Sequence, residues 1–239
     1  YLIAGNQYGA VVGGTYLRTG SGGANDDGLN IPDGDVVVNS DSSSNEYGFQ
    51  AVDPVQRAIG NPNPDFILGW NNQIKIGPVN AGFLLDWREG GDMLNGVAWA
   101  LSFFGRSQLT ADTRTEAPTP IPGVKADGSP NDIPVVRDQY YYQSSVGGFG
   151  SVWEQFVEDG GWIRLREVSL GYDIPMSKIG IDFIDSGNLS IVGRNLWYST
   201  DYNGVDPETS LTGVGNGQGV DYFNMPSTRS VMAKLKLNL

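Results

Sequence analysis

Cysteine and histidine are both absent from this chain of 239 residues. Without them there is no disulfide, no thiol chemistry, no zinc site built on Cys or His, and no nucleophile activated by histidine. The densest apolar stretch, residues 97–104, is too short for a membrane helix. A formal net charge of −12 argues against a nucleic-acid partner, which would need a basic surface. We therefore expect no catalytic residues, no metal and no cofactor.

The clearest positive feature is the alternation of apolar and polar residues in the final segment, 230–239. Val231, Ala233, Leu235, Leu237 and Leu239 share one face of an extended strand, and only Met232 breaks the polar series on the other. A tilted strand of about ten residues is also long enough to cross a bilayer. This pattern fits either an edge strand of a soluble sandwich or the closing strand of an outer-membrane barrel.

The same pattern recurs upstream and predicts four further strands, with a weaker sixth near the start. The first two form a hairpin around the turn at residues 77–80. In the third, the apolar phase slips by one residue at Arg166-Glu167, which indicates a β-bulge. The expected strands lie near residues 10–18, 64–76, 81–88, 162–174, 188–198 and 229–239.

The connections alternate between long and short, and this favours the barrel. Long loops are expected at 19–63, 89–160 and 199–228, with helical turns near 92–104, 140–142 and 151–156, and short connections at 77–80 and 175–187. Loop 19–63 holds 7 acidic residues and 1 basic residue, loop 89–160 holds 10 and 4, and loop 199–228 holds 4 and none. The excess negative charge is therefore expected on one side of the sheet. Outer-membrane barrels alternate in this way, and the long loops are extracellular.

Six strands are too few to close such a barrel, because the smallest have about eight. An open sheet would leave unpaired backbone groups in lipid at both edges. The sequence therefore predicts an all-β fold: the C-terminal fragment of a larger antiparallel transmembrane β-barrel. The chain begins at Tyr1 without a visible signal peptide, so a signal was removed or the chain is a piece of a longer protein.

Two sets of candidate functional residues follow. Lumen-facing side chains on the first hairpin would hydrate a channel and hydrogen-bond to what it contains, and the charged members could alternatively form an acid–base cluster with Glu89 and Asp92. Aromatic residues in the long loops could stack on sugar rings or peptide side chains, or pack the loops together. The lumen-facing set is Asn71, Gln73, Lys75, Asp86 and Arg88, and the loop set is Tyr140, Tyr141, Tyr142, Trp153, Tyr202 and Tyr222.

Further aromatic residues lie near the predicted strand ends and could form the interfacial girdle of a membrane barrel. Cross-strand packing in a soluble sheet is the alternative explanation. The acidic loops leave an irregular calcium site open, although none has the spacing of a twelve-residue calcium loop. The girdle candidates are Trp70, Trp87, Trp162, Tyr172, Trp197 and Tyr198.

Several motifs in register resemble the C-terminal part of SusC/RagA-family transporters, which are TonB-dependent outer-membrane proteins of Bacteroidetes. They are Gly60-Asn-Pro-Asn-Pro-Asp-Phe-Ile-Leu-Gly69, Phe83-Leu-Leu-Asp-Trp-Arg-Glu-Gly-Gly-Asp92, Trp162-Ile-Arg-Leu-Arg-Glu-Val-Ser-Leu-Gly-Tyr172, Gly193-Arg-Asn-Leu-Trp197 and Tyr202-Asn-Gly-Val-Asp-Pro-Glu208. One departure is the terminal Leu239, where such barrels often end in an aromatic residue.

The resemblance implies a barrel of about 22 strands around an N-terminal plug. It also implies that the protein resides in the cell outer membrane, in contact with its lipid, and is not an enzyme. Nutrient uptake would consist of importing oligosaccharides or peptides in a SusCD-like complex, under a SusD-like lipoprotein lid. TonB would act through the N-terminal part that this chain lacks. The alternative function is that of a soluble, secreted, β-rich, lectin-like carbohydrate-binding protein.

Overall fold

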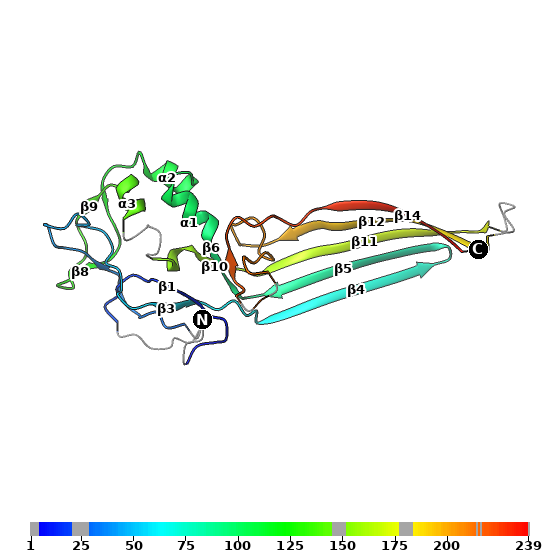
Figure 1. Ribbon diagram of the computed structural model, residues 1–239, viewed down its shortest axis with the longest axis horizontal. Coiled ribbons are helices and arrows are strands. Elements are labelled where there is room, and N and C mark those ends of the chain that lie inside the picture. Colours follow the sequence, from blue (N-terminus) through cyan, green and yellow to red (C-terminus); the bar gives the residue numbers. More distant parts are fainter. Residues whose placement is uncertain are drawn as a thin grey trace. The chain divides into compact units, whose positions relative to one another are not determined.

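Five long antiparallel strands form one sheet in the computed structural model, which describes residues 5–20, 29–144, 152–176, 184–213, 215 and 217–238. Figure 1 shows these strands side by side in the order β14-β12-β11-β5-β4. All five expected long strands are present. They are β4 (Phe66–Ile76), β5 (Val79–Glu89), β11 (Trp162–Ile174), β12 (Ser186–Ser199) and β14 (Ser230–Asn238). Leu239, the last residue of the expected final strand, lies outside the described residues.

The register separates apolar from polar side chains onto two faces, because residues paired across neighbouring strands point to the same side. The apolar face carries continuous rows of large side chains, and Trp70, Leu170 and Val231 are 53%, 57% and 69% exposed. Its rows include Trp70, Leu85, Leu165 and Trp197, then Phe83, Val168 and Val231, then Leu170 and Ile191, and then Tyr172, Leu189 and Leu235. The polar face carries, among others, Glu167, Ser169, Asp173, Asn188, Arg194, Lys234 and Lys236.

The predicted β-bulge in β11 is confirmed, and it explains the change of phase in the sequence. The pairing of β11 with both β5 and β12 shifts between Leu165 and Glu167. One extra residue, Arg166, is inserted there, so Leu165 and Val168 point to the same side although they are three positions apart. Without the bulge, the two apolar halves of β11 would face opposite sides of the sheet.

The connections alternate as the sequence indicates. β4 and β5 are joined by the two residues Gly77 and Pro78, and Gly77 has a φ of 57°, which favours glycine. The long connections lie before β4, between β5 and β11, and between β12 and β14. The two outer strands each have one neighbour within the described sheet, β5 for β4 and β12 for β14. No helix among the described residues is long and apolar enough to span a membrane.

The long connections fold into a unit of their own, here called the loop unit, made of residues 1–63, 91–160 and 203–224, whereas residues 64–90, 161–202 and 225–239 form the sheet unit. Segments 21–28, 145–151, 214 and 216 of the expected loops lie outside the described residues. The strands of the loop unit are β1 (Val11–Gly13), β2 (Val37–Val38), β3 (Arg57–Gly60), β6 (Asp92–Asn95), β7 (Thr119–Pro120), β8 (Val124–Lys125), β9 (Pro134–Val135), β10 (Val157–Asp159) and β13 (Val220–Asp221). Its helices are α1 (Gly96–Phe103), α2 (Gln108–Thr113), α3 (Gln139–Gln143) and the 3₁₀ turn η1 (Glu154–Phe156).

The weak strand expected at residues 10–18 does not join the long sheet. Only β1 forms there, and it pairs with β3 inside the loop unit. Its two glycines, Gly13 and Gly14, end the regular stretch, and the Cβ of any larger residue at Gly13 would lie 2.6 Å from the Ile59 side chain. Close packing within the loop unit therefore decides the role of this segment.

Two hydrophobic cores hold the loop unit together. The first contains Tyr16, Phe49, Ile121, Ile133, Val135, Tyr141, Tyr142 and Val152. The second contains Val11, Ile59, Leu94, Trp99 and Phe156. Each core gathers residues from segments far apart in the sequence, so these connections are folded rather than extended loops.

The first core should make the loop unit sensitive to alkali. Burial raises the pKa of Tyr16 far above its ordinary value, and the neighbouring Tyr141 and Glu154 raise it further. A raised tyrosine pKa means that the folded state keeps its proton while the unfolded chain loses it from about pH 10, so stability is constant below that pH and falls above it. We expect denaturation midpoints, followed by tryptophan emission, to drop less steeply between about pH 9 and 11 in Tyr16→Phe than in the unmodified protein. Identical slopes would contradict this assignment.

Candidate functional site

The five residues predicted to face a lumen all lie on the polar face of the sheet. On β4 and β5 the cross-strand pairs are Asn71 with Leu84, Gln73 with Gly82, Lys75 with Asn80, Gly69 with Asp86 and Ile67 with Arg88. Because paired residues point to the same side, Asn71, Gln73, Lys75, Asp86 and Arg88 share one surface. The structure thus brings this predicted set together.

Three carboxylates on the polar face are hydrogen-bonded to side chains of other strands rather than left available for acid–base chemistry. Asp173 accepts hydrogen bonds from Lys75 Nζ at 2.8 Å, Asn80 Nδ2 at 3.1 Å and Asn188 Nδ2 at 2.7 Å. Arg166 Nε donates to Asp86 at 2.7 Å, and Arg194 Nε donates to Glu167 at 2.9 Å. These three carboxylates are each hydrogen-bonded, and the surface is wettable, which suits the wall of an aqueous passage.

Two carboxylates of the alternative acid–base cluster, Asp86 and Glu89, lie on opposite faces of the sheet. Glu89 lies on the apolar face with Trp87 and accepts a hydrogen bond from its Nε1 at 2.9 Å, whereas Asp86 lies on the polar face. Asp92 belongs to the loop unit, where it accepts from the Asn61 N–H at 2.6 Å. Within the part of the chain that the structure describes, no three acidic side chains gather in a way that could hold a metal ion.

Four of the six girdle candidates, Trp70, Trp87, Tyr172 and Trp197, lie on the apolar face. Trp87 packs edge-on against Phe66 at a centroid distance of 5.0 Å, and Trp70 packs edge-on against Phe83 at 5.2 Å. The other two, Trp162 and Tyr198, lie on the polar face and so do not belong to a girdle on the apolar side. They flank the guanidinium of Arg164 at 5.5 Å and 5.0 Å in cation–π contacts, because strand phase turns them away from the apolar side.

The six loop aromatics are dispersed. Tyr140 is 48% exposed, whereas Tyr141 and Tyr142 are 7% and 8% exposed and belong to the first core. One turn of α3 points these two rings inward, so they pack the loops together, which is one of the two roles that the sequence leaves open. Tyr202 is also buried, and its N–H donates to Thr200 Oγ1 at 3.1 Å. Of the six, Trp153 and Tyr222 line one apolar cavity in the loop unit.

This apolar cavity has a volume of about 340 Å³ and is the candidate site for an apolar group. Its wall is formed by residues from β1, β6, α1, β13 and the segments beside η1 and β13. Trp99 and Trp153 lie 5.9 Å apart between ring centroids, and Trp153 Nε1 is buried without a hydrogen-bond partner among the described residues. The cavity volume is at the lower end of the range for ligand pockets. The indole N–H of Trp153 offers a bound molecule one polar contact. The larger lining residues are Leu94, Trp99, Trp153, Leu211, Val220 and Tyr222.

No sequence pattern indicated Leu94 and Trp99 as site residues, because only long-range strand pairing brings them to this wall. β6 pairs with β10 on one side and, in parallel, with β13 on the other, with Leu94 opposite Val220. Asn95 then caps α1 by accepting the Ala98 N–H at 2.9 Å, which turns Trp99 toward the cavity wall. The Asn95 cap before an apolar run was the available local signal for the helix, but not for the cavity.

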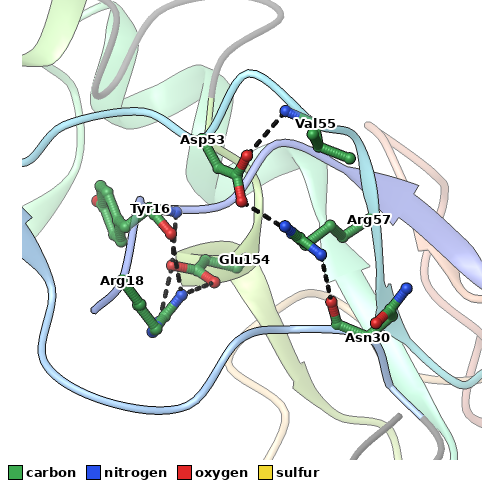
Figure 2. A network of polar contacts seen from close by, with 7 residues as sticks. All are labelled: Tyr16, Arg18, Asn30, Asp53, Val55, Arg57 and Glu154. Carbon is green, nitrogen blue, oxygen red and sulfur yellow. Dashed lines mark hydrogen bonds and ion pairs between the residues drawn. The ribbon is translucent and has the colours of Figure 1, made fainter. Parts of the chain in front are cut away.

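A network of ion pairs fixes the segment that carries Trp153 (Figure 2). Glu154 pairs with Arg18 through two contacts of 3.0 Å and also accepts the Tyr16 N–H at 3.1 Å. The Trp153 N–H donates to the Gly14 carbonyl at 3.0 Å. A second pair joins Arg57 Nε to Asp53 at 2.8 Å. The contacts of Glu154 and of the Trp153 N–H tie residues 14–18 to η1, about 140 residues later in the sequence.

The same wall depends on a glycine. A Cβ built at Gly96 would lie 2.7 Å from the Asp221 carbonyl oxygen and 2.9 Å from the Tyr222 ring. We therefore expect Gly96→Ala to push β13 from β6 and to destabilise the loop unit by about 1–3 kcal/mol, measured by hydrogen exchange of the β13 amides. Gly215→Ala is the control, since its Cβ would approach no described residue more closely than 3.5 Å. Equal protection in both variants would count against this role for Gly96.

Comparison with known proteins gives relatives of one kind, although no family model matches the chain. It is 27% identical over 227 residues to TonB-dependent receptor P3 of Formosa agariphila, covering 88% of this chain and 20% of that protein. It is 29% identical over 189 residues to TonB-dependent receptor P26 of the same organism, covering 75% of this chain and 17% of that protein. The chain therefore spans about a fifth of the length of the curated relatives that it matches.

Solved structures give the same fold at low identity. The RagAB peptide importer in its open-open state aligns with a TM-score of 0.54 and 15% identity, over 96% of this chain and 22% of that chain. Its closed-closed state aligns with a TM-score of 0.53 and 16% identity, over 95% and 23% of the two chains. The predicted fold class and the resemblance in sequence are thereby confirmed. The chain is thus similar to TonB-dependent receptors, and it has the fold of part of an antiparallel transmembrane β-barrel.

Proposed function

We propose that this chain forms part of the channel wall and the extracellular loops of an outer-membrane receptor that imports oligosaccharides or peptides. Import is driven by TonB, which acts through parts of the receptor outside this chain. A SusD-like lipoprotein covers the outer opening. The observation that carries the proposal is that the sheet has one apolar face and one polar face, because the wall of a channel through lipid requires both.

The dimensions of the strands support a position in the membrane. The five strands contain 11, 11, 13, 14 and 9 residues, and tilted strands of about 9–11 residues cross the hydrocarbon core. The apolar rows face lipid, and Trp70, Trp87, Tyr172 and Trp197 contribute to the interfacial girdle. The outer strands β4 and β14 pair with further strands of the barrel, since unpaired backbone groups are costly in lipid.

The polar face supplies the channel side of the proposal. Asn71, Gln73, Lys75, Asp86 and Arg88 hydrate the passage and hydrogen-bond to the plug or to the cargo. In the loop unit, Trp153 and Tyr222 contact an apolar part of the cargo through the cavity that they line, and the exposed Tyr140 is available for stacking on it. The acidic loops face the outside of the cell, where the lid docks.

The alternative of a soluble, lectin-like protein finds no support in the sheet. A soluble sandwich covers its apolar face with a second sheet, since exposed apolar patches of this extent cause association. Here Trp70, Leu170 and Val231 are each more than half exposed on that face. We therefore favour the membrane protein.

An uptake experiment with the full-length receptor tests the proposal. Cells that express the receptor together with its lipoprotein partner are given fluorescent oligosaccharides and peptides, and uptake is compared with a receptor deletion strain and with cells whose proton gradient is collapsed. We expect uptake of at least one class of cargo that requires both the receptor and the gradient, and a receptor that is extracted only with detergent. A receptor found in the soluble fraction, or uptake unchanged by its deletion, would overturn the proposal.

A further inference from the structure

Three arginines surround one polar cavity in the otherwise acidic loop unit. The sequence of this unit contains 19 acidic residues and only six basic ones. Arg18, Arg57 and Lys125 each pair with a carboxylate in the folded unit. The other three, Arg106, Arg114 and Arg137, line a cavity of about 520 Å³. Half of the positive charge of the unit is thus gathered at one place.

Local structure explains how Arg106 reaches this position. Helix α1 ends in a Schellman motif, in which the Gly105 N–H donates to the Ser102 carbonyl at 3.1 Å and the Arg106 N–H donates to the Leu101 carbonyl at 2.7 Å. Gly105 has a φ of 65°, a conformation that favours glycine. The motif turns the chain sharply, so that Arg106 follows directly after the helix and lines the cavity.

Hydrogen bonds between the three helices hold the cavity in shape. Arg114 Nη2, at the end of α2, donates to the Gly105 carbonyl at 3.1 Å. Gln143 Nε2, in α3, donates to the Phe103 carbonyl at 3.1 Å, and a buried contact of 2.8 Å joins the Tyr142 and Thr113 hydroxyl oxygens. These contacts connect α1, α2 and α3 around the cavity. Its walls are therefore fixed before a ligand arrives, which lowers the cost of binding.

The guanidinium groups are unequally engaged. Arg137 pairs with Glu116 at the surface. Asp138 also lines the cavity, but its carboxylate accepts the N–H groups of Tyr140 at 2.9 Å and Tyr141 at 3.2 Å. The guanidinium of Arg106 has no hydrogen-bond or ion-pair partner among the described residues, and it is exposed. Donors therefore remain available at this cavity, and the one nearby acid on its wall is committed to capping α3.

We propose that this cavity binds a carboxylate group of the imported molecule, an inference that rests on the import function proposed above. The planar fork of arginine matches a carboxylate with two parallel hydrogen bonds. The surrounding acidic unit repels anions, and it repels a doubly charged phosphate more than a singly charged carboxylate. A polar cavity of this size accommodates the end of an oligomer. The carboxylate can belong to a uronic acid or to the C-terminus of a peptide.

Calorimetry on the full-length receptor in detergent tests the site with matched probes. One pair is an acetylated tetrapeptide with a free C-terminus and its C-terminal amide, and the other is a galacturonate hexamer and its methyl ester. We expect the free acid of at least one pair to bind about tenfold or more tightly than its neutral form, since charge-assisted hydrogen bonds are lost with the charge. The pair that shows the difference identifies the source of the carboxylate.

Variants then place the effect at the cavity. Arg106→Gln should weaken binding of the acid about tenfold and leave the affinity for the neutral form unchanged. Lys125→Gln removes the same charge from the same unit outside the cavity and should leave both affinities unchanged. The inference is overturned if neither acid binds, if acid and neutral form bind alike, if both variants weaken the acid equally, or if inorganic sulfate displaces the acid at equal concentration.

The binding experiment and the uptake experiment test the carboxylate site and the import function independently. Binding in detergent needs neither TonB nor a proton gradient, so a receptor that binds the acid but imports nothing contradicts only the import function. A receptor that imports its cargo while Arg106→Gln binds every acid normally contradicts only the carboxylate site.

Discussion

Replacing Val168 by arginine should prevent most of the receptor from assembling in the outer membrane. Val168 lies at the middle of β11 on the apolar face, opposite Phe83 on one side and Gly193 on the other. An arginine that faces lipid near the midplane of a bilayer costs about 2–4 kcal/mol. The measurement is the fraction of full-length receptor that migrates as the folded form without heating and resists protease in isolated outer membranes.

Ser169→Arg provides a matched control on the next residue of the same strand. Ser169 lies on the polar face opposite Gly82 and Val192, so an arginine there would reach water and oppose no like charge. We expect this variant to assemble nearly as well as the unmodified receptor. If the two variants assemble equally, or if Ser169→Arg is the worse, lipid does not lie against the apolar face.

Arg18→Met should be the most damaging single change in the loop unit. The Arg18 and Glu154 side chains are only 19% and 8% exposed, and removing the arginine leaves the Glu154 carboxylate with one backbone donor, the Tyr16 N–H. Breaking one side of a buried ion pair costs about 3–5 kcal/mol, because the remaining charge is neither solvated nor paired. The Trp153 amide, which donates to Gly14, should exchange its hydrogen correspondingly faster.

Lys125→Met tests whether any lost ion pair has the same effect. Its partner Asp132 is 79% exposed, so water solvates that carboxylate when the lysine is removed. Exchange at Trp153 should then stay unchanged. Comparable acceleration in both variants would show that the Arg18–Glu154 pair does not fix the segment beside the apolar cavity.

The long strands could be predicted from the sequence because a strand between lipid and water needs only local information. Alternation with a period of two marks both the extended backbone and its two faces, and the five strands begin and end within two residues of the expected limits where both are described. Even the bulge at Arg166 was visible as a slip of phase. Asn71, Gln73 and Lys75 could be assigned to one face for the same reason.

Only the tertiary structure decided what the long connections do. Alternation carries no information about residues that meet across many positions, so the burial of Tyr141 and Tyr142, the wall of Leu94, Trp99, Trp153 and Tyr222, and the convergence of Arg106, Arg114 and Arg137 could not be predicted. The sequence by itself determined the two faces of the sheet, since each side chain there faces lipid or water and its polarity alone indicates which. The cavities of the loop unit exist only in the folded state, because their walls come from segments that only long-range packing brings together.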